Sequence, residues 1–192
     1  VAIAAEDATR GLRAAHAAFW LSPQTLALAV IGPGKVGAAL LDQLQAALPR
    51  LRSEANVDLR LRALATSRRM WLCDHGDPAD WRTRIAEEPQ PADLDAITTH
   101  LLDSHLPHAV VIDCSASDSV AAQYPAWLAA GIHVITPNKH AGAGPLPRYA
   151  AIREARASSG ARFRYEATVG AGLPVISTLR DLLDTGDELV AV

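Results

Sequence analysis

The stretch AVIGPGKVGAALL, residues 29–41, places three glycines between an apolar run and a run with helical spacing. The apolar run from Thr25 to Ile31 predicts a buried strand. After the glycines, apolar residues recur at every fourth position, as one face of a helix requires: Val36, Leu40, Leu44 and Leu48. A strand, a glycine turn and a helix therefore follow one another directly, which is typical of the unit that opens a parallel α/β sheet.

Each glycine has its own task in such a turn. Gly32 permits the tight turn after the strand, Gly34 removes a side chain that would block a pyrophosphate, and Gly37 lets helix and strand pack closely. The free N–H groups at the start of the helix then face the phosphates. The bare spacing GxGxxG also occurs in ordinary tight turns. Because a strand precedes it and a helix follows it, we predict a dinucleotide site.

The end of the next strand bears on which dinucleotide fits. It reads ATSRR, residues 65–69, and no carboxylate follows until Asp74. An NAD-selective site usually has Asp or Glu here to bind the ribose hydroxyls. A 2′-phosphate would be tolerated beside Ser67 and could pair with the guanidinium of Arg68 or Arg69. The sequence favours NADP, and NAD remains possible, because both arginines fit equally well as solvated residues that open a loop.

Strand and helix signals alternate along the rest of the chain. Residues 56–67, NVDLRLRALATS, alternate with a period of two and predict an outer strand with one more polar face. Residues 74–92 carry prolines and charges and predict a solvent-facing excursion. Three more strands are expected within residues 108–117, 131–139 and 161–172, and helices over about Asp93 to His105, Val120 to Ala130 and Leu146 to Ser158. This alternation predicts an α/β fold, a doubly wound, mainly parallel sheet of the Rossmann type with helices on both faces.

Composition limits the classes of function. A chain of 192 residues that is 49% hydrophobic can bury a full core. Its 18 basic and 21 acidic residues are interspersed, so we expect no nucleic-acid partner. No apolar run approaches the roughly 20 residues of a membrane span, so we expect no membrane partner. The two cysteines, Cys73 and Cys114, form no CxxC motif, which favours a reducing, cytoplasmic location.

Other chemically tempting residues receive structural interpretations. Pro107 and the strand after it prevent His100, His105 and His108 from sharing one helix face, so we interpret them as loop histidines rather than a metal site. Cys114 has no base that can be placed beside it and is interpreted as a small buried residue. The tryptophans lack regular spacing and are assigned to packing: Trp20, Trp71, Trp81 and Trp127.

Three segments at expected strand ends carry a more specific signal: DCSAS at 113–117, TPNKHA at 136–141 and YEATVGAGLPVI at 165–176. With these motifs the chain resembles homoserine dehydrogenase over nearly its whole length. Its opening, EDATRGLRAAHAAFW, is similar to the regulatory tail and linker of the bifunctional aspartokinase/homoserine dehydrogenases. The resemblance therefore implies residues 1–22 as that tail and linker and residues 23–192 as the dinucleotide-binding domain, with the substrate and catalytic domain cut off after Val192.

The resemblance also assigns roles. Gly34, Lys35 and Val36 match positions that follow the cofactor diphosphate, Ser115 matches a hydroxyl near the nicotinamide, and Lys139 matches a lysine that reaches the cofactor and the reacting centre. Without the resemblance, Lys139 is more typical of a solvated loop lysine and Ser115 of a strand-end cap. A monovalent-cation site, such as one for sodium, is implied at four further positions: Glu166, Val169, Ala171 and Leu173.

The implied reaction interconverts L-aspartate 4-semialdehyde and L-homoserine with NADP(H), on the route to threonine and methionine. The family's principal catalytic residues lie beyond the segment that matches GDELVAV, so we expect them beyond Val192. Lys139 is then auxiliary, and the chain is a cofactor-binding part that is inactive alone. We also expect a small-molecule substrate and a homo-oligomer. A non-catalytic nucleotide-sensing module and another semialdehyde reductase remain alternatives.

Overall fold

The computed structural model describes residues 24–87, 90–103, 106–188 and 190, with only positions 4, 7–9, 11, 12 and 15 before them. The expectation of a regulatory tail over residues 1–22 therefore lies almost wholly outside the described residues. Val192, after which the catalytic domain is expected, also lies outside them, so the structure does not test that domain boundary. None of the helices within the described ranges is long and apolar enough to cross a membrane.

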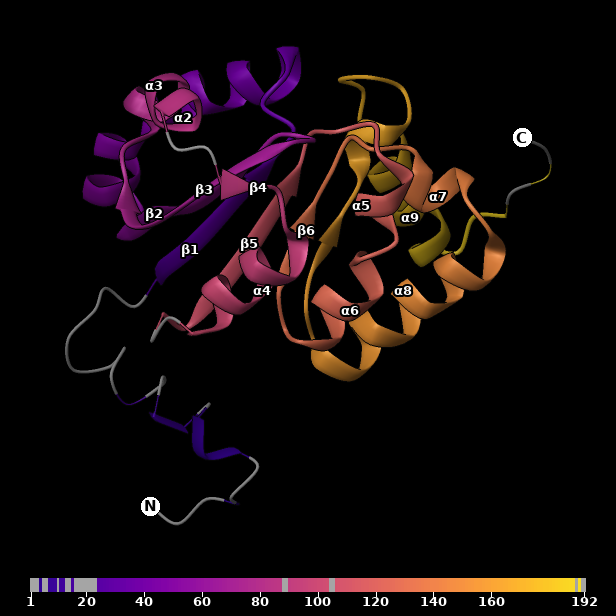
Figure 1. Cartoon of the computed structure of the whole chain (residues 1–192). Coiled ribbons are helices and arrows are strands. Elements are labelled where there is room, and N and C mark those ends of the chain that lie inside the picture. The colour runs from indigo at the N-terminus through magenta and orange to yellow at the C-terminus, as the bar shows by residue number, and fades with distance from the viewer. Residues whose placement is uncertain are drawn as a thin grey trace.

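One seven-stranded sheet forms the centre of the molecule, with the strand order β4-β3-β2-β1-β5-β6-β7 (Figure 1). Neighbours from β2 through β1, β5 and β6 to β7 pair in parallel, whereas β3 pairs antiparallel with β2 and β4. The strands are β1 Gln24–Ile31, β2 Val57–Ala65, β3 Arg69–Gly76, β4 Gln90–Pro91, β5 His108–Asp113, β6 His133–Ile135 and β7 Phe163–Arg164. The predicted mainly parallel α/β sheet is confirmed.

Helices cover both faces of this sheet. They are α2 Lys35–Glu54, α3 Trp81–Glu87, α4 Leu94–Asp103, α5 Asp118–Ala121, α6 Tyr124–Ala129, α7 His140–Ala143, α8 Leu146–Ser159 and α9 Val175–Asp184, with 3₁₀ turns η2 Pro78–Asp80 and η3 Glu166–Thr168. Figure 1 shows α2 and α3 on one face and α4, α6 and α8 on the other. Two separate apolar cores lie between these helices and the sheet.

The central strand β1 contributes to both cores. Ala27, Ala29 and Ile31 belong to the core beneath α4, α6 and α8, whereas Leu28 and Val30 belong to the core beneath α2 and α3. Successive side chains of a strand point to opposite faces, so a strand covered on both sides is apolar at every position. This explains why the apolar run in the sequence correctly predicts a buried strand.

The prediction that the second strand lies at the edge of the sheet is wrong. β2 lies between β1 and β3, and its last five residues are buried. The polar residue Arg62 is only 7% exposed, and its Nη1 donates to Oδ1 of Asp74 on β3 at 2.8 Å. An alternating strand can be internal when the neighbouring strand supplies a partner for its polar side chains.

Residues 74–92 are also more regular than predicted. They contain the end of β3, the turn η2, helix α3 and, after residues 88 and 89, strand β4. Trp81 and Ile85 of α3 are buried against the sheet. Because the regular elements here are short, no helical period is long enough to be recognised in the sequence.

Two predicted helices differ in detail. The helix expected over Val120 to Ala130 is broken into α5 and α6, because Pro125 has no N–H to bond to the carbonyl of residue 121. In α2, the buried positions begin with Gly37 and Leu41, whereas Val36 is 58% exposed. The predicted face is therefore wrong at Val36 but right at Leu44, which packs against the core beneath α2.

Candidate functional site

The glycine turn after β1 is packed too tightly for any other residue at its first position. Gly32 adopts a left-handed φ of +77°, and its N–H donates to the carbonyl of Ala65 at the end of β2 at 2.8 Å. A Cβ atom on Gly32 would lie 2.7 Å from the backbone nitrogen of Ser115. The turn therefore joins the ends of β1 and β2 to the loop after β5.

The two later glycines of the motif differ from each other. A Cβ atom on Gly37 would clash with the carbonyl oxygen of Gly32 and lie 3.3 Å from Cβ of Cys114, so this glycine is required for the helix to pack on the turn. A Cβ atom on Gly34 would meet nothing within 4 Å. The packing of the protein itself does not require glycine there, but a ligand that approaches the backbone would.

The start of α2 is suited to bind an anion. Gly34 is its N-cap and supplies no side-chain hydrogen bond, and no acidic residue lies in the first turn. The first amides of a helix have no intrahelical partner, and the helix dipole places partial positive charge there. The backbone at Lys35, Val36 and Gly37, with the exposed Lys35 side chain, therefore forms a cradle whose chemistry fits a diphosphate.

At the end of β2 the structure separates the two arginines. Thr66 Oγ1 accepts hydrogen bonds from the amides of Arg68 and Arg69, at 3.2 and 2.9 Å, which turns the chain into β3. Arg69 directs its Nη1 to the carbonyl of Ala86 on α3, at 3.4 Å. The side chains of Ser67 and Arg68 are exposed. Of the two predicted phosphate partners, Arg68 is therefore the one left available.

A buried carboxylate organises the loop that follows β5. Asp113 is fully buried, and its Oδ1 accepts from the amide of Ser115 at 2.7 Å. Its Oδ2 accepts from the hydroxyl of Tyr124 at 2.5 Å and from Nδ2 of Asn138 at 3.0 Å. Three donors thus satisfy a negative charge that would otherwise be costly to bury. Burial and the charge of Asp113 raise the pKa of Tyr124 above its ordinary value, so its hydroxyl stays protonated.

The same network holds the TPNK loop. Thr136 Oγ1 donates to the carbonyl of Asp113 at 2.8 Å and accepts from the amide of Asn138 at 2.8 Å. Asn138 also donates to the carbonyl of Ser117 at 2.9 Å and accepts from the amide of His140 at 3.1 Å. Lys139, between these two anchored residues, is exposed. The structure therefore brings the Ser115 and Lys139 loops together, as expected for strand ends in a parallel sheet.

Sequence reasoning missed the residues that connect these loops, namely Asp113, Tyr124, Thr136 and Asn138. Asp113 carried a usable signal, because it is a charged residue at the end of the apolar run HAVVID. Its partner Tyr124 lies in a helix and gives no local sign of this role. Cys114 lies next to Asp113 in the chain. Burial and then the charge of Asp113 raise the pKa of its thiol to about 11, which is consistent with a structural rather than a nucleophilic residue.

The predicted cation ligands all lie in the turn-rich segment between β7 and α9. The carboxylate of Glu166 faces α9, where it accepts from the amides of Ile176 and Ser177 at 2.8 and 3.0 Å. The carbonyl of Leu173 accepts from the amide of Val175 at 2.9 Å. Two further predicted ligand positions are exposed, Val169 and Ala171, the latter with a φ of +53°. In this conformation the residues fit a cation only in part, because the carboxylate caps a helix.

The histidines were predicted to be loop residues rather than metal ligands. Among the described residues, no three His, Cys, Asp or Glu side chains gather as metal ligands. His100 lies in α4, not in a loop as predicted, and its Nε2 is 2.9 Å from the carbonyl oxygen of Cys73. His105 lies outside the described residues. Trp20 lies outside the described residues, and the other tryptophans are buried as predicted: Trp71, Trp81 and Trp127.

Comparison with known proteins agrees with this geometry. A family model described as "Homoserine dehydrogenase, NAD binding domain" matches residues 32–166. The bifunctional aspartokinase/homoserine dehydrogenase 1 of Zea mays, a chloroplastic protein, is 49% identical over 97% of this chain and 20% of its own length. The bifunctional enzyme of Haemophilus influenzae is 36% identical over 95% of this chain and 22% of its own length. The chain thus spans about a fifth of these relatives.

Solved structures show the same fold. A Candida auris protein of unknown function is 31% identical, with a TM-score of 0.74 over 86% of this chain and 45% of its own. A hyperthermophilic archaeal homoserine dehydrogenase in complex with NADPH is 22% identical, with a TM-score of 0.64 over 84% of this chain and 50% of its own.

Proposed function

This chain belongs to the homoserine dehydrogenase family as its NAD-binding domain, and from that premise we propose that it holds NADP(H) for the interconversion of L-aspartate 4-semialdehyde and L-homoserine. The observation that carries the proposal is the glycine turn. Gly32 and Gly37 are required by packing, whereas Gly34 leaves open space in front of an uncapped helix. A diphosphate fits there because the start of the helix carries partial positive charge, offers free N–H donors and leaves open space.

The bound cofactor supplies the hydride, and the protein supplies binding and orientation. The amides of Lys35, Val36 and Gly37 would hold the diphosphate, and the hydroxyl of Ser115 would contact the nicotinamide part of the cofactor. Lys139 places a positive charge where alkoxide character develops on the substrate oxygen. The buried Asp113 network supports these roles, because it fixes both loops before any ligand arrives.

The preference for NADP over NAD rests on the end of β2. No carboxylate stands there, and Arg68 is exposed beside Ser67. A guanidinium binds a phosphate through paired N–H groups. The NADPH in the archaeal homoserine dehydrogenase, which shares the fold, is in line with this choice.

Several parts of the proposal lie beyond the cofactor turn. A monovalent cation at Glu166, Val169, Ala171 and Leu173 would require the Glu166 carboxylate to share its lone pairs with α9. The principal catalytic residues are proposed to lie beyond Val192, since the aspartokinase-linked relatives are about five times as long as these 192 residues. A homo-oligomer and a cytoplasmic location are retained as proposals, although the name of the Zea mays relative gives a chloroplastic location.

Calorimetric titration with NADPH and NADH tests the cofactor site. Arg68→Glu should weaken NADPH binding by roughly 1.5 to 3 kcal/mol and leave NADH nearly unchanged, because only NADPH carries the 2′-phosphate. Gly34→Ala should weaken both cofactors, since its methyl group enters the space left for the diphosphate. Arg50→Glu, at the far end of α2, is the matched charge control. Equal losses for both cofactors in Arg68→Glu would contradict the NADP assignment.

A turnover assay separates cofactor binding from catalysis. With NADPH and aspartate semialdehyde across a range of pH, we expect binding but little or no oxidation of NADPH, because proximity and alkoxide stabilisation are incomplete. A rate on the order of 10 per second would place the catalytic residues inside this chain and contradict the proposal.

A further inference from the structure

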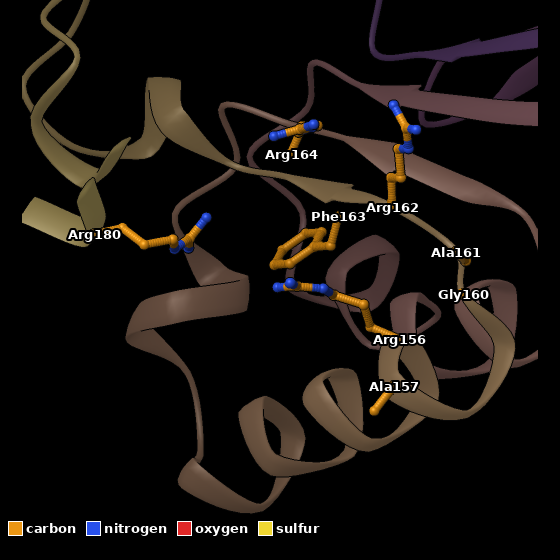
Figure 2. Close-up of a pocket in the computed structure, with 8 residues that line it drawn as sticks. All are labelled: Arg156, Ala157, Gly160, Ala161, Arg162, Phe163, Arg164 and Arg180. Carbon is orange, nitrogen blue, oxygen red and sulfur yellow. The ribbon is translucent and has the colours of Figure 1, made fainter. Parts of the chain in front are cut away.

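A cavity lies at the β7 edge of the sheet, away from the glycine turn. It has a volume of about 500 Å³ and lies beside β7, three positions along the sheet from β1. Its walls come from the end of α8, the segment through β7 and helix α9 (Figure 2). The lining residues are Arg156, Ala157, Gly160, Ala161, Arg162, Phe163, Arg164 and Arg180.

Four of these eight residues are arginines: Arg156 lies in α8, Arg164 in β7, Arg180 in α9, and Arg162 directly precedes β7. In Figure 2, the guanidinium group of Arg156 lies next to the Phe163 ring and that of Arg180 points toward it from α9, whereas Arg162 and Arg164 extend from the opposite side of the strand. All four side chains belong to exposed residues. The cavity is therefore open to solutes and lined by positive charge.

No carboxylate neutralises this charge within the part of the chain that the structure describes. Elsewhere, Arg60, Arg62, Arg82 and Arg148 each lie within 4 Å of an aspartate oxygen. Among the described residues, no such ion pair involves the four cavity arginines. Arg180 Nη2 has a neutral partner, the hydroxyl of Tyr165 at 3.1 Å. Like charges that line one cavity repel one another, and an anion between them would relieve that repulsion.

The size and walls of the cavity indicate the class of anion. About 500 Å³ lies in the range of small-molecule sites and exceeds what a chloride ion needs. Gly160, Ala157 and Ala161 have small side chains or none, so most of the cavity volume is free for a ligand. Guanidinium groups from several directions suit a molecule with two or more phosphate or carboxylate groups, each bound through paired N–H donors.

We propose that the cavity formed by Arg156, Arg162, Arg164 and Arg180 is a binding site for a small multivalent anion, separate from the dinucleotide turn. The shared chemistry is two or more phosphates or carboxylates on one small molecule. This proposal does not depend on the proposed dehydrogenase function, because the cavity shares no residue with the glycine turn, Ser115 or Lys139.

Calorimetry on the whole chain at low salt, with sodium tripolyphosphate and with citrate as separate probes, tests the proposal. At least one probe should bind with one-to-one stoichiometry, and comparing the two distinguishes phosphate from carboxylate recognition. The double variant Arg156→Gln with Arg164→Gln should weaken binding by about tenfold or more, since two charged hydrogen-bond donors are lost. Arg153→Gln is the matched control, because Arg153 is exposed on the same helix but does not line the cavity.

Three further results decide the outcome. Saturating NADPH should leave tripolyphosphate binding in place, and the double variant should bind NADPH as the unmodified chain does. Circular dichroism and thermal unfolding verify that the variants remain folded. Equal weakening in Arg153→Gln would overturn the proposal, because it would indicate diffuse charge attraction. Displacement of tripolyphosphate by NADPH would overturn it too, because the anion would then occupy the cofactor site. A polyglutamate peptide is a third probe, and binding of this peptide alone would indicate a protein-docking face instead.

Discussion

Two regions of the parallel sheet, the glycine turn after β1 and the edge at β7, differ in how their polar groups are satisfied. Around the glycine turn, the buried Asp113 has three donors, and the chain leaves no room for a Cβ atom on Gly32 or Gly37. Around β7 and α9, four arginines lack carboxylate partners among the described residues, and no residue of α9 is buried. The first region is pre-formed by its own chain, whereas the second has charged groups that remain available to a ligand.

This difference predicts where substitutions cost stability and where they change only binding. An atom added to a well-packed turn displaces the neighbouring residues, because the turn has no free space to accommodate it. A helix with no buried residue, such as α9, tolerates changes on its surface. Four substitutions test this contrast, in order of decreasing effect.

The largest effect is expected at Gly32. Gly32→Val adds both backbone strain at a φ of +77° and a clash with Ser115, and should lower the free energy of unfolding by about 4 kcal/mol. Gly131→Val is the matched control, because Gly131 has a φ of +83° but open space around a Cβ atom. Urea unfolding measures both variants. Equal losses would mean that strain alone, and not the contact with the Ser115 loop, accounts for the effect.

A buried and an exposed leucine give the second contrast. Leu128 on α6 is fully buried, and Leu128→Ala should cost about 3 kcal/mol of unfolding free energy. Leu183 on α9 is 48% exposed, and Leu183→Ala should cost less than about 0.5 kcal/mol. Sedimentation of the Leu183 variant should also show less self-association if this apolar surface is what joins copies of the chain. A large stability loss at Leu183 would show that α9 is packed more firmly than the structure indicates.

The third substitution removes one donor from the buried network. Tyr124→Phe leaves Asp113 with two donors and should lower the free energy of unfolding by about 2 kcal/mol. The pKa of Tyr124 is raised in the folded chain, so the folded state holds its proton more tightly than the unfolded state. Stability should therefore fall as the pH rises above about 10, the ordinary tyrosine value, and Tyr124→Phe should show less of this fall. Tyr149 is hydrogen-bonded to Tyr165, whose pKa burial and then Tyr149 also raise, so Tyr149→Phe is measured beside it to separate the share of that pair in the fall.

The smallest effect concerns the attachment of β7. His133 Nδ1 accepts a hydrogen bond from the amide of Arg162 at 2.9 Å, which requires that nitrogen to be unprotonated. Burial, followed by the charges of His108 and Arg162, lowers the pKa of His133. The unfolded chain thus binds the proton more readily, and stability should fall slightly as the pH drops below about 6.5. Urea unfolding at pH 7.5 and 5.5 should show a weaker pH dependence in His133→Gln. An unchanged dependence would assign it to other histidines.

The sequence predicted the parts of the site that depend on local chain geometry. The glycine turn could be recognised because strand, turn and helix follow one another directly in the chain, and Gly32 adopts the backbone conformation that glycine favours. Ser115 and Lys139 could be placed together because parallel strands end at one edge. The cation ligands and the catalytic residues expected beyond Val192 stay predictions. The helix cap made by Glu166 could not be foreseen, since α9 was not among the predicted helices.

What the sequence by itself determined is the order of the parallel strands and of the longer helices between them, the parallel α/β class and the position of the phosphate turn. These follow from side-chain periodicity and from the special backbone freedom of glycine, which act within a few residues. Only the tertiary structure decided that β2 is internal, that Asp113 meets Tyr124 and Asn138, and that four arginines line one cavity. These features depend on contacts between distant segments: Asp113 lies 11 residues from Tyr124 and 25 residues from Asn138 along the chain. No local sequence pattern encodes which distant partner a side chain meets.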